Sequence, residues 1–245
     1  MAVAYRTISA QANNGGTGTL TLTAPAGAVS GDLFVACIAY RGTVDPIGLP
    51  TGWTQIEKVF VSNVATNNTA RPSLLMAWIQ RGGANPSFAF TGFNNVATGF
   101  VIRLDGHDTL SPIDVSTSLL SDSLAALHTT GAITPTRNDG LWIGMACAGV
   151  EGTNGTAWSS HNLLVGVNST INPMTEIADF STTLGADVDI AIAYIAYASI
   201  SNLDPLVASS YESTHDRSSR SSLGLVAIKP PAAPTATSRS FAVIC

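Results

Sequence analysis

Histidine, aspartate and serine are the residues of this chain that could do chemistry, but their spacing follows no common catalytic pattern. The sequence lacks the G-x-S-x-G turn of serine hydrolases, the H-E-x-x-H zinc motif, the phosphate-binding G-x-x-x-x-G-K loop and a C-x-x-C pair. The four histidines occur singly, and each is predicted to be a loop or surface residue: His107, His128, His161 and His215. We therefore expect no enzymatic activity, no catalytic residue, no metal ion and no cofactor.

Two groups of aspartates come closest to a binding site. Asp105-Gly106-His107-Asp108 follows an apolar run and could present carboxylates to a cation or a sugar. The pattern is more typical of a turn that ends a strand and is capped by aspartate. Asp187 and Asp189 lie two residues apart, on one face of a predicted strand. A calcium ion needs more oxygen ligands than these two supply, so we predict a solvated start of a strand.

One charged segment and two tryptophans could serve recognition instead. The segment Tyr211–Arg220 concentrates charge, which favours a solvated connection or the polar rim of an interface. Trp53 and Trp158 could be platforms on which a sugar ring stacks. A tryptophan near the start of a strand is more often a packing residue, and we predict packing for both.

The end of the chain is the strongest candidate for a partner-binding segment. From Lys229 onward the sequence is rich in Pro, Ala, Ser and Thr, so it cannot pair as a central strand. It then closes on an apolar run, which is consistent with either a frayed tail or an arm that docks on a neighbouring subunit. The predicted partner-binding residues are Pro230, Pro231, Pro234, Arg239, Phe241, Val243 and Ile244.

The elements that must position these residues are predicted to be β-strands. Apolar runs of five to eleven residues, rich in Val, Ile, Leu and Thr, alternate with turn pairs such as Asn14-Gly15 and Asp139-Gly140. We predict an all-β, antiparallel β-sandwich of the jelly-roll type over residues 19–229, with extended arms at 1–18 and 230–245. The clearest predicted strands are Asp32–Arg41, Ser73–Gln80, Thr98–Leu104, Leu141–Val150, Asp187–Tyr197 and Ser222–Ile228.

A weak internal similarity suggests a duplicated topology. Gly31-Asp32-Leu33 and Asp139-Gly140-Leu141 each form a tight turn that leads into an apolar strand containing a cysteine. Each half then closes with a further apolar strand. The spacings differ between the halves, and no linker-like stretch separates them, so we predict one sandwich and not two domains.

Composition bounds the function as much as the motifs do. Of the 245 residues, 45% are hydrophobic but only 11% are charged, well below the roughly 25% of typical soluble domains. Charge is depleted at the centres of protein interfaces, so the composition hints that neighbours cover much of the surface. The net charge is −5, and the sequence contains no cluster of cations, which argues against nucleic-acid binding. The longest apolar run is too short for a membrane span.

The three cysteines bear on the redox compartment. Cys37 and Cys147 each lie within an apolar strand run, and Cys245 is the last residue. The opening MAVAYRTISA lacks the basic and apolar regions of a secretory signal, so we expect synthesis in a cytoplasm. A disulfide is disfavoured there, and we predict that Cys37 and Cys147 are buried free thiols.

Several of these segments together resemble phage-encoded structural proteins of the jelly-roll type. The resemblance is carried by Pro25–Leu33, by Leu49–Ile56, by the strand Leu74–Gln80, by Gly99–Asp105 ahead of Pro112-Ile113-Asp114, and by the last strand running into Lys229-Pro230. It implies a virion structural protein that acts as a capsid decoration (cement) protein. Such a protein would be a homotrimer on the outer capsid surface, made in the host cytoplasm, with the major capsid protein and other copies of itself as partners.

Two alternatives remain open at the level of sequence. The first is a carbohydrate-binding module of the tail or virion surface, which would attach to host glycans. The second is a hydrolase that uses scattered acidic residues. The resemblance carries no functional residue over to either alternative.

Overall fold

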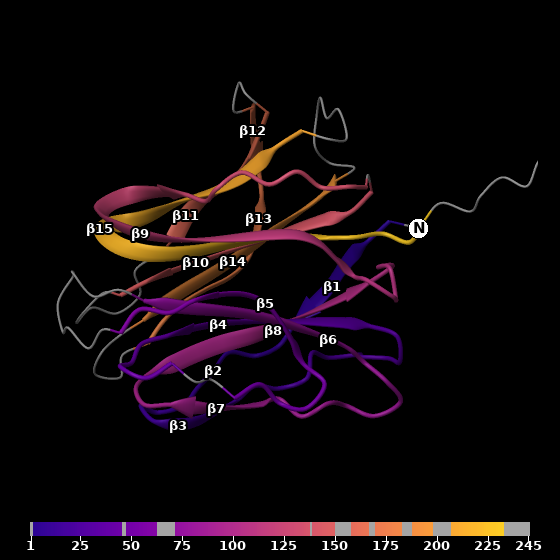
Figure 1. The fold of residues 1–245 in the computed structure, drawn as a ribbon, viewed down its shortest axis with the longest axis horizontal. Helices are drawn as coiled ribbons and strands as arrows, with labels where there is room; N and C mark the ends of the chain where they lie inside the picture. Colours follow the sequence, from indigo (N-terminus) through magenta and orange to yellow (C-terminus); the bar gives the residue numbers. More distant parts are fainter. Residues whose placement is uncertain are drawn as a thin grey trace, which may run out of the picture.

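A computed structural model describes residues 2–45, 48–62, 72–137, 139–149, 158–166, 170–182, 188–197 and 207–232. All the elements within these ranges are β-strands, and every strand pair is antiparallel. The predicted all-β, antiparallel sandwich is confirmed. Figure 1 shows its strands stacked in layers, with the first half of the chain in the lower layers and the second half in the upper layers.

The first half of the chain builds one sheet and a small cover. The sheet has the order β1 (Ala4–Ile8), β8 (Ala97–Asp105), β4 (Leu33–Tyr40), β6 (Ser73–Gln80) and β5 (Thr54–Val59), and β2 (Ala12–Asn13) also pairs with β8. The cover is the pair β3 (Gly18–Thr21) and β7 (Ala89–Phe93). Residues 1–18, which the sequence predicted as an arm, therefore contain two strands that lie along the first sheet.

The second half builds the other sheet. Its order is β12 (Thr170–Pro173), β11 (Trp158–Val165), β15 (Ser209–Ile228), β10 (Leu141–Ala148), β14 (Asp189–Ala196) and β13 (Thr175–Ser181), and β9 (Ile113–Thr129) also pairs with β15. The long strands β9 and β15 bend together, and their pairing shifts register between Thr214 and Ser221. Such bulges increase the local bend of a strand, which lets this ribbon leave the central sheet and enter the outer layer.

The two halves repeat one topology. The order β1-β8-β4-β6-β5 in the first sheet corresponds to the order β9-β15-β10-β14-β13 in the second. The strands β4 and β10, which carry the similar sequences, occupy the same central position in their sheets. The structure therefore supports the duplicated topology that the sequence suggested. The strands β11 and β12 are an addition of the second half, so Trp158 on β11 has no counterpart in Trp53.

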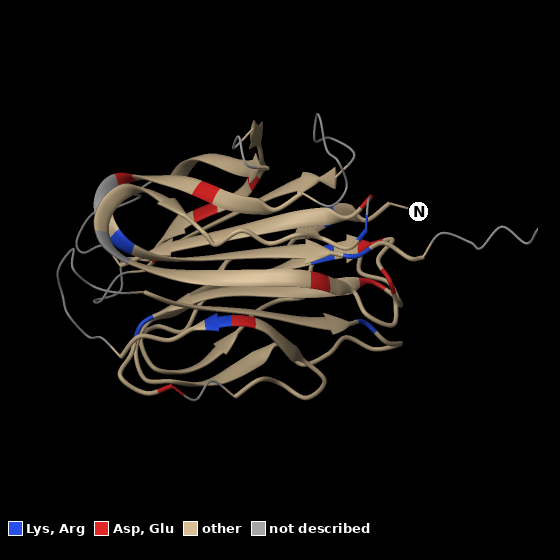
Figure 2. Ribbon diagram, turned by 45° about the horizontal axis from the view of Figure 1, so that its top comes forward, with Lys and Arg blue, Asp and Glu red and all other residues tan. Residues whose placement is uncertain are grey.

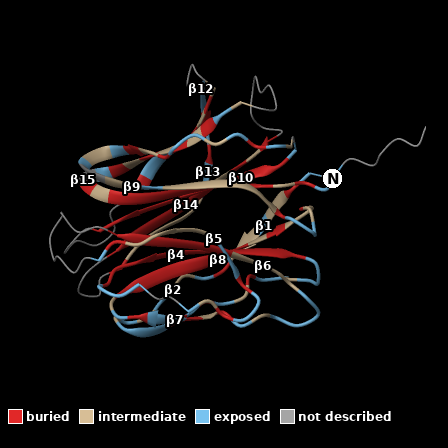
Figure 3. Cartoon of the chain, in the orientation of Figure 1, coloured by how far each residue is buried: buried red, intermediate tan, exposed pale blue. Residues whose placement is uncertain are grey.

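Side-chain alternation along the central strands explains how the layers adhere. Leu33, Val35, Cys37 and Ala39 of β4 join the core between the two sheets, whereas the residues between them face the cover of the first half. The strand β10 divides its side chains in the same way between the central core and the outer layer of the second half. Figure 3 shows that the buried residues concentrate in these central sheets. Trp53 and Trp158 are 7% and 2% exposed, so both pack as predicted.

Cys37 and Cys147 are buried free thiols of the central core, which confirms the prediction from sequence. Burial raises the pKa of both thiols, which keeps them in the unreactive protonated form. We expect a thiol reagent to leave both unmodified in the folded protein, and to modify all three cysteines of the chain after denaturation without a reductant. A Cys245→Ser control isolates the two core thiols. A denatured protein with a single reactive thiol would show that the other two are bridged.

Candidate functional site

The base of the C-terminal segment is held in a fixed position by hydrogen bonds beyond the last strand. β15 ends at Ile228, yet the backbone N–H of Lys229 donates to the carbonyl oxygen of Pro112 over 2.7 Å. The backbone N–H of Asp108 donates to the carbonyl oxygen of Lys229, also over 2.7 Å. The chain therefore leaves the sandwich only after both backbone polar groups of Lys229 have bonded to the segment that joins β8 to β9.

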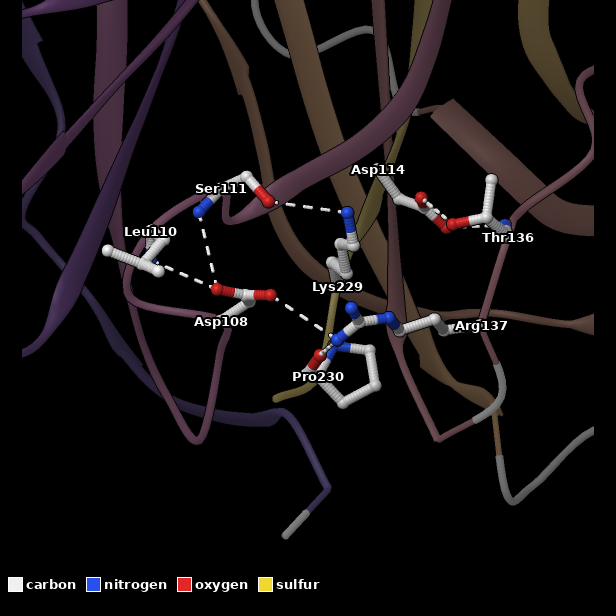
Figure 4. A network of polar contacts seen from close by, with 8 residues as sticks. All are labelled: Asp108, Leu110, Ser111, Asp114, Thr136, Arg137, Lys229 and Pro230. Carbon is white, nitrogen blue, oxygen red and sulfur yellow. Dashed lines mark hydrogen bonds and ion pairs between the residues drawn. The ribbon is translucent and has the colours of Figure 1, made fainter. Parts of the chain in front are cut away.

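Asp108 and Arg137 extend this anchor to Pro230, as Figure 4 shows. Arg137 Nη1 donates to the carbonyl oxygen of Pro230 over 2.9 Å and lies 3.3 Å from Asp108 Oδ2. Asp108 Oδ1 accepts the backbone N–H groups of Leu110 and Ser111 over 3.0 and 3.3 Å. These amides, first that of Leu110, lower the pKa of Asp108, so the carboxylate stays ionised opposite Arg137. Asp108 is therefore the cap of a strand-ending turn, as predicted, and it also orients an arginine.

Two further contacts tie the surrounding loops to the same frame. Lys229 Nζ donates to Ser111 Oγ over 3.2 Å. The carboxylate of Asp114 accepts the backbone N–H of Thr136 over 2.6 Å and also the hydroxyl of Thr136, which fixes the residue before Arg137. Three chain segments distant in sequence thus converge on the point where the C-terminal segment begins. We call this set of residues the arm anchor: Asp108, Ser111, Asp114, Thr136, Arg137, Lys229 and Pro230.

The arm anchor relates to the predicted partner-binding residues as follows. Pro230 is buried within the anchor, and Pro231 is exposed directly after it. The other predicted residues lie outside the described part of the chain: Pro234, Arg239, Phe241, Val243 and Ile244. The sequence reasoning missed Asp108 and Arg137 as anchor residues. The turn pattern around Asp108 was visible, but nothing in the sequence placed it next to Arg137 and Pro230.

The prediction that the histidines are loop or surface residues is correct for His107, which lies in the loop between β8 and β9, and wrong for the other three. All four are buried, with exposed fractions between 1% and 4%. Three of them lie on strands β9, β11 and β15, where alternation turns their rings into the outer layer of the second half. Burial also lowers the pKa values of His107, His128 and His161.

His161 lies among groups that resemble a serine–histidine–acid arrangement. Its Nδ1 is 2.7 Å from the hydroxyl of Tyr211 and 3.0 Å from Ser213 Oγ, and its Nε2 is 3.1 Å from Glu176 Oε2. Ser213 has no exposed surface, and Tyr211 shares the same ring nitrogen. A substrate cannot reach a nucleophile in this position, so the arrangement satisfies buried polar groups and does not form an open active site.

A second buried group joins His215 to Asp189. His215 Nε2 lies 3.2 Å from Asp189 Oδ2, and neither side chain is exposed. The ring of His215 packs edge-on against Trp158 at 4.7 Å between centroids. The predicted solvated strand start at Asp189 is wrong because Asp189 points into the core, and Asp187 lies outside the described residues. The predicted charged loop at residues 211–220 is wrong because this segment is part of β15, with Tyr211, Ser213 and His215 facing inward.

Asp179, on β13, completes this polar interior. Its Oδ2 accepts the backbone N–H of Trp158 over 2.9 Å, while its Oδ1 is buried without a hydrogen-bond partner among the described residues. Burial, and then the nearby charge of Glu176, raise the pKa of Asp179 to about 7. Asp189 and His215 also act on this carboxyl from the neighbouring strands. Asp179 is therefore a carboxyl that the fold holds near its titration point at neutral pH.

We expect Asp179→Asn to stabilise the protein at pH 8 and to have little effect at pH 4. Because the pKa of Asp179 is raised, the folded state holds a proton that the unfolded state has lost, and stability falls as pH rises from about 4 to about 7. Asparagine does not ionise, so it avoids this loss of stability. Because Asp179 is partly exposed, we expect the gain in unfolding free energy at pH 8 to be roughly 1–2 kcal/mol. Urea unfolding at the two pH values measures the effect.

Asp108→Asn is the matched control for this experiment. The pKa of Asp108 is lowered, so the same substitution there should destabilise the protein at pH 8. An equal effect of Asp179→Asn at both pH values, or a loss of stability at pH 8, would contradict the position of Asp179 in the structure.

A surface pocket of about 380 Å³ lies between β12, β13 and β14. Its walls include Asn172, Thr175 and Tyr194, and the ring of Tyr194 stacks on Tyr5 at 4.6 Å between centroids. This volume is at the lower end of the range for small-molecule pockets. Aromatic and polar side chains side by side are the combination that a sugar ring requires.

The described residues show neither a metal-binding cluster nor a membrane helix. In these ranges no three His, Cys, Asp or Glu side chains are placed to hold a metal ion together. The same part of the chain has no helix of the length and apolarity that a bilayer span needs. No protein-family model, no curated protein and no solved structure matches this chain.

Proposed function

We propose that this chain is a structural protein of a phage particle, a capsid decoration (cement) protein that acts by binding other subunits and not by catalysis. In this role it assembles as a homotrimer on the outer capsid surface and bridges major capsid subunits. The C-terminal segment, from Pro230 onward, is the part that reaches the neighbouring subunit. The resemblance of the sequence to phage structural proteins supports the class, and the structure supports the use of the C-terminal segment.

The arm anchor is the observation that carries this proposal. A tail with no partner needs no fixed origin, yet three segments converge to fix the chain through Pro230. Proline restricts the backbone, so Pro231 and Pro234 would lower the entropy lost when the segment binds. Its apolar end then supplies area that is unfavourable in water. An anchored, stiff segment with an apolar tip fits the requirements of a docking arm.

The surface supports the same proposal. Figure 2 shows charged residues as isolated segments on a mostly uncharged chain. The salt bridges on the surface of the described residues are single pairs, such as Arg6 with Asp105 and Lys58 with Asp45. A surface with few charges loses little solvation when another subunit covers it. Interfaces of this kind bury on the order of 1,000 Å² or more.

Quantitative mass spectrometry of purified phage particles tests the proposal. We expect the protein in intact particles at a copy number comparable to that of the major capsid protein. We also expect heads stripped of it to lose stability to heat or osmotic shock. A copy number typical of tail proteins would indicate a role in the tail instead of the capsid. Absence of the protein from particles would refute a virion role.

The second candidate function is glycan binding, and the pocket beside Tyr194 is the observation that favours it. A module of the tail or virion surface would use Tyr194 as a stacking ring, with the exposed Thr175 as a hydrogen-bonding group. Glycan-array binding that is lost in Tyr194→Ala and kept in Tyr194→Phe would favour this function. If both variants lose glycan binding, or both keep it, stacking on the ring of Tyr194 is not what binds the glycan.

A further inference from the structure

The outer edge of β9 is a long strand edge with no partner among the described strands. β9 runs over Ile113–Thr129, and the strand that pairs with it is β15, which covers one of its two edges. The first part of β9 is tied to the first sheet, because Ser116 and Ser118 donate to the carboxylate of Glu57 over 2.6 and 2.8 Å. Beyond Ser118 the strand continues into the bent ribbon of the outer layer (Figure 1).

The other edge strands of the two sheets are shorter than β9, and each carries charged residues or proline. Exposed edges are normally blunted by short length, charged side chains or proline, because they otherwise pair with other chains. β1 is five residues long and contains Arg6, β5 contains Glu57 and Lys58, and β12 is four residues long and ends in Pro173. β9 has 17 residues without proline, Lys or Arg, and its charged residues are Asp114 and Asp122.

Exposed leucines accompany this edge. Leu119, Leu124 and Leu127 are 38%, 48% and 52% exposed, and they account for three of the seven large hydrophobic residues exposed in the described ranges. The cluster falls on the part of β9 beyond the contacts with Glu57. Unpaired backbone groups next to exposed leucines form the surface that an added apolar strand requires.

The C-terminal segment has the properties of that added strand. Phe241-Ala242-Val243-Ile244-Cys245 is apolar and rich in residues that favour strands. Ten residues separate it from the anchored Pro230, and an extended proline-rich chain of that length reaches roughly 30 Å. This exceeds the radius of gyration of roughly 18 Å expected for a chain of this size, so the segment can reach a neighbouring copy.

The direction of the chain favours a neighbouring copy over its own β9. Ile228 at the end of β15 pairs with Ile113 at the start of β9, so the chain leaves the sheet at the end of β9 opposite to Leu127. We infer that residues 241–245 of one copy add as a strand to the outer edge of β9 in another copy, against Leu119, Leu124 and Leu127. This inference rests on the proposed assembly function and names the surface that the arm binds.

Photo-crosslinking of the full chain tests where the arm binds. A benzophenone amino acid replaces Phe241, and ¹⁴N- and ¹⁵N-labelled copies are mixed before irradiation, so that mass spectrometry separates contacts between copies from contacts within one copy. We expect mixed-isotope crosslinks between the C-terminal segment and residues 113–129. Crosslinks confined to one copy, crosslinks to another surface or the absence of crosslinks would each overturn the inference.

Paired variants measure the strength of the contact. Leu124→Asp with Leu127→Asp disables the edge, and Phe241→Asp with Val243→Asp disables the arm. We expect each double variant to weaken self-association roughly tenfold or more in sedimentation velocity, because each places charges in an apolar contact. A mixture of the two variants keeps one intact arm and one intact edge, so association between the two species should return.

Two single variants complete the experiment. Val44 is 50% exposed and lies outside β9 and the arm anchor, so Val44→Asp should leave association unchanged. Ile171→Asp alters a wall of the pocket beside Tyr194. If this variant weakens self-association and the β9 variants do not, the arm docks in the pocket instead.

The inference and the proposed function can fail separately. If crosslinks to β9 form but particles lack the protein, the proposed virion role fails and the inference stands. If the protein is in particles and the crosslinks lie elsewhere, the inference alone fails.

Discussion

Removal of Pro231–Cys245 is expected to leave the sandwich folded and to reduce binding to the particle at least about tenfold. The last strand ends at Ile228, and the contact from Arg137 to Pro230 is kept, so the unfolding free energy should change by less than about 1 kcal/mol. Burial of Phe241, Val243 and Ile244 is worth on the order of 5 kcal/mol before ordering costs, and all of it is lost. Urea unfolding and particle-binding assays measure the two effects.

A full-length variant separates the chemistry of the arm from its length. Substitution of Phe241, Val243 and Ile244 by serine keeps the proline-rich path and removes only the apolar contacts. We expect this variant to bind as weakly as the truncated protein. Undiminished binding of the truncated protein would show that the segment is a tail without a partner.

Asp189→Ala should lower the unfolding free energy by about 3–5 kcal/mol. The side chains of Asp189 and His215 are both fully buried, and Asp189 Oδ2 lies 3.2 Å from His215 Nε2. Removal of the carboxylate leaves the buried ring of His215 without this partner. Urea unfolding at pH 7 measures the loss, which is a large part of the total stability of a typical domain.

Asp105→Ala is the matched control for this prediction. Asp105 also lies on a strand and forms an ion pair with Arg6 at 2.7 Å, but the two side chains are 34% and 51% exposed. An exposed pair contributes about 0–1 kcal/mol, so the control should be nearly neutral. Equal effects of the two substitutions would mean that Asp189 is solvated and that the buried group around His215 is absent.

Much of the fold could be predicted because the central strands are buried on both faces. The strand Ser73–Gln80 was predicted with the bounds that the structure shows, and Leu141–Val150 ends two residues beyond β10. Continuous apolar sequence between turn pairs gives such strands a local pattern. The same pattern indicated that Cys37 and Cys147 are buried, because both cysteines lie within these runs.

The polar strands could not be predicted, because their partners are distant in sequence. The first part of β15 contains Glu212, His215 and Asp216 and was interpreted as a loop, although β11 and β9 pair with it on its two sides. The long strand β9 is rich in serine, and it is not among the clearest strands predicted from the sequence. These strands carry polar side chains on both faces, so their sequences show no alternation of apolar and polar residues. No local pattern therefore distinguishes such a strand from a loop.

The amino-acid sequence by itself determined the class of fold, the central strands, the free thiols and the presence of an unusual C-terminal segment. Each of these depends on local composition or on a period of two residues. Only the tertiary structure decided that His161 lies beside Glu176 and Ser213, and that Arg137 lies beside Asp108 and Pro230. These contacts join residues 15 to 93 positions apart, and the sheet order and register that create them are set by packing between the two halves.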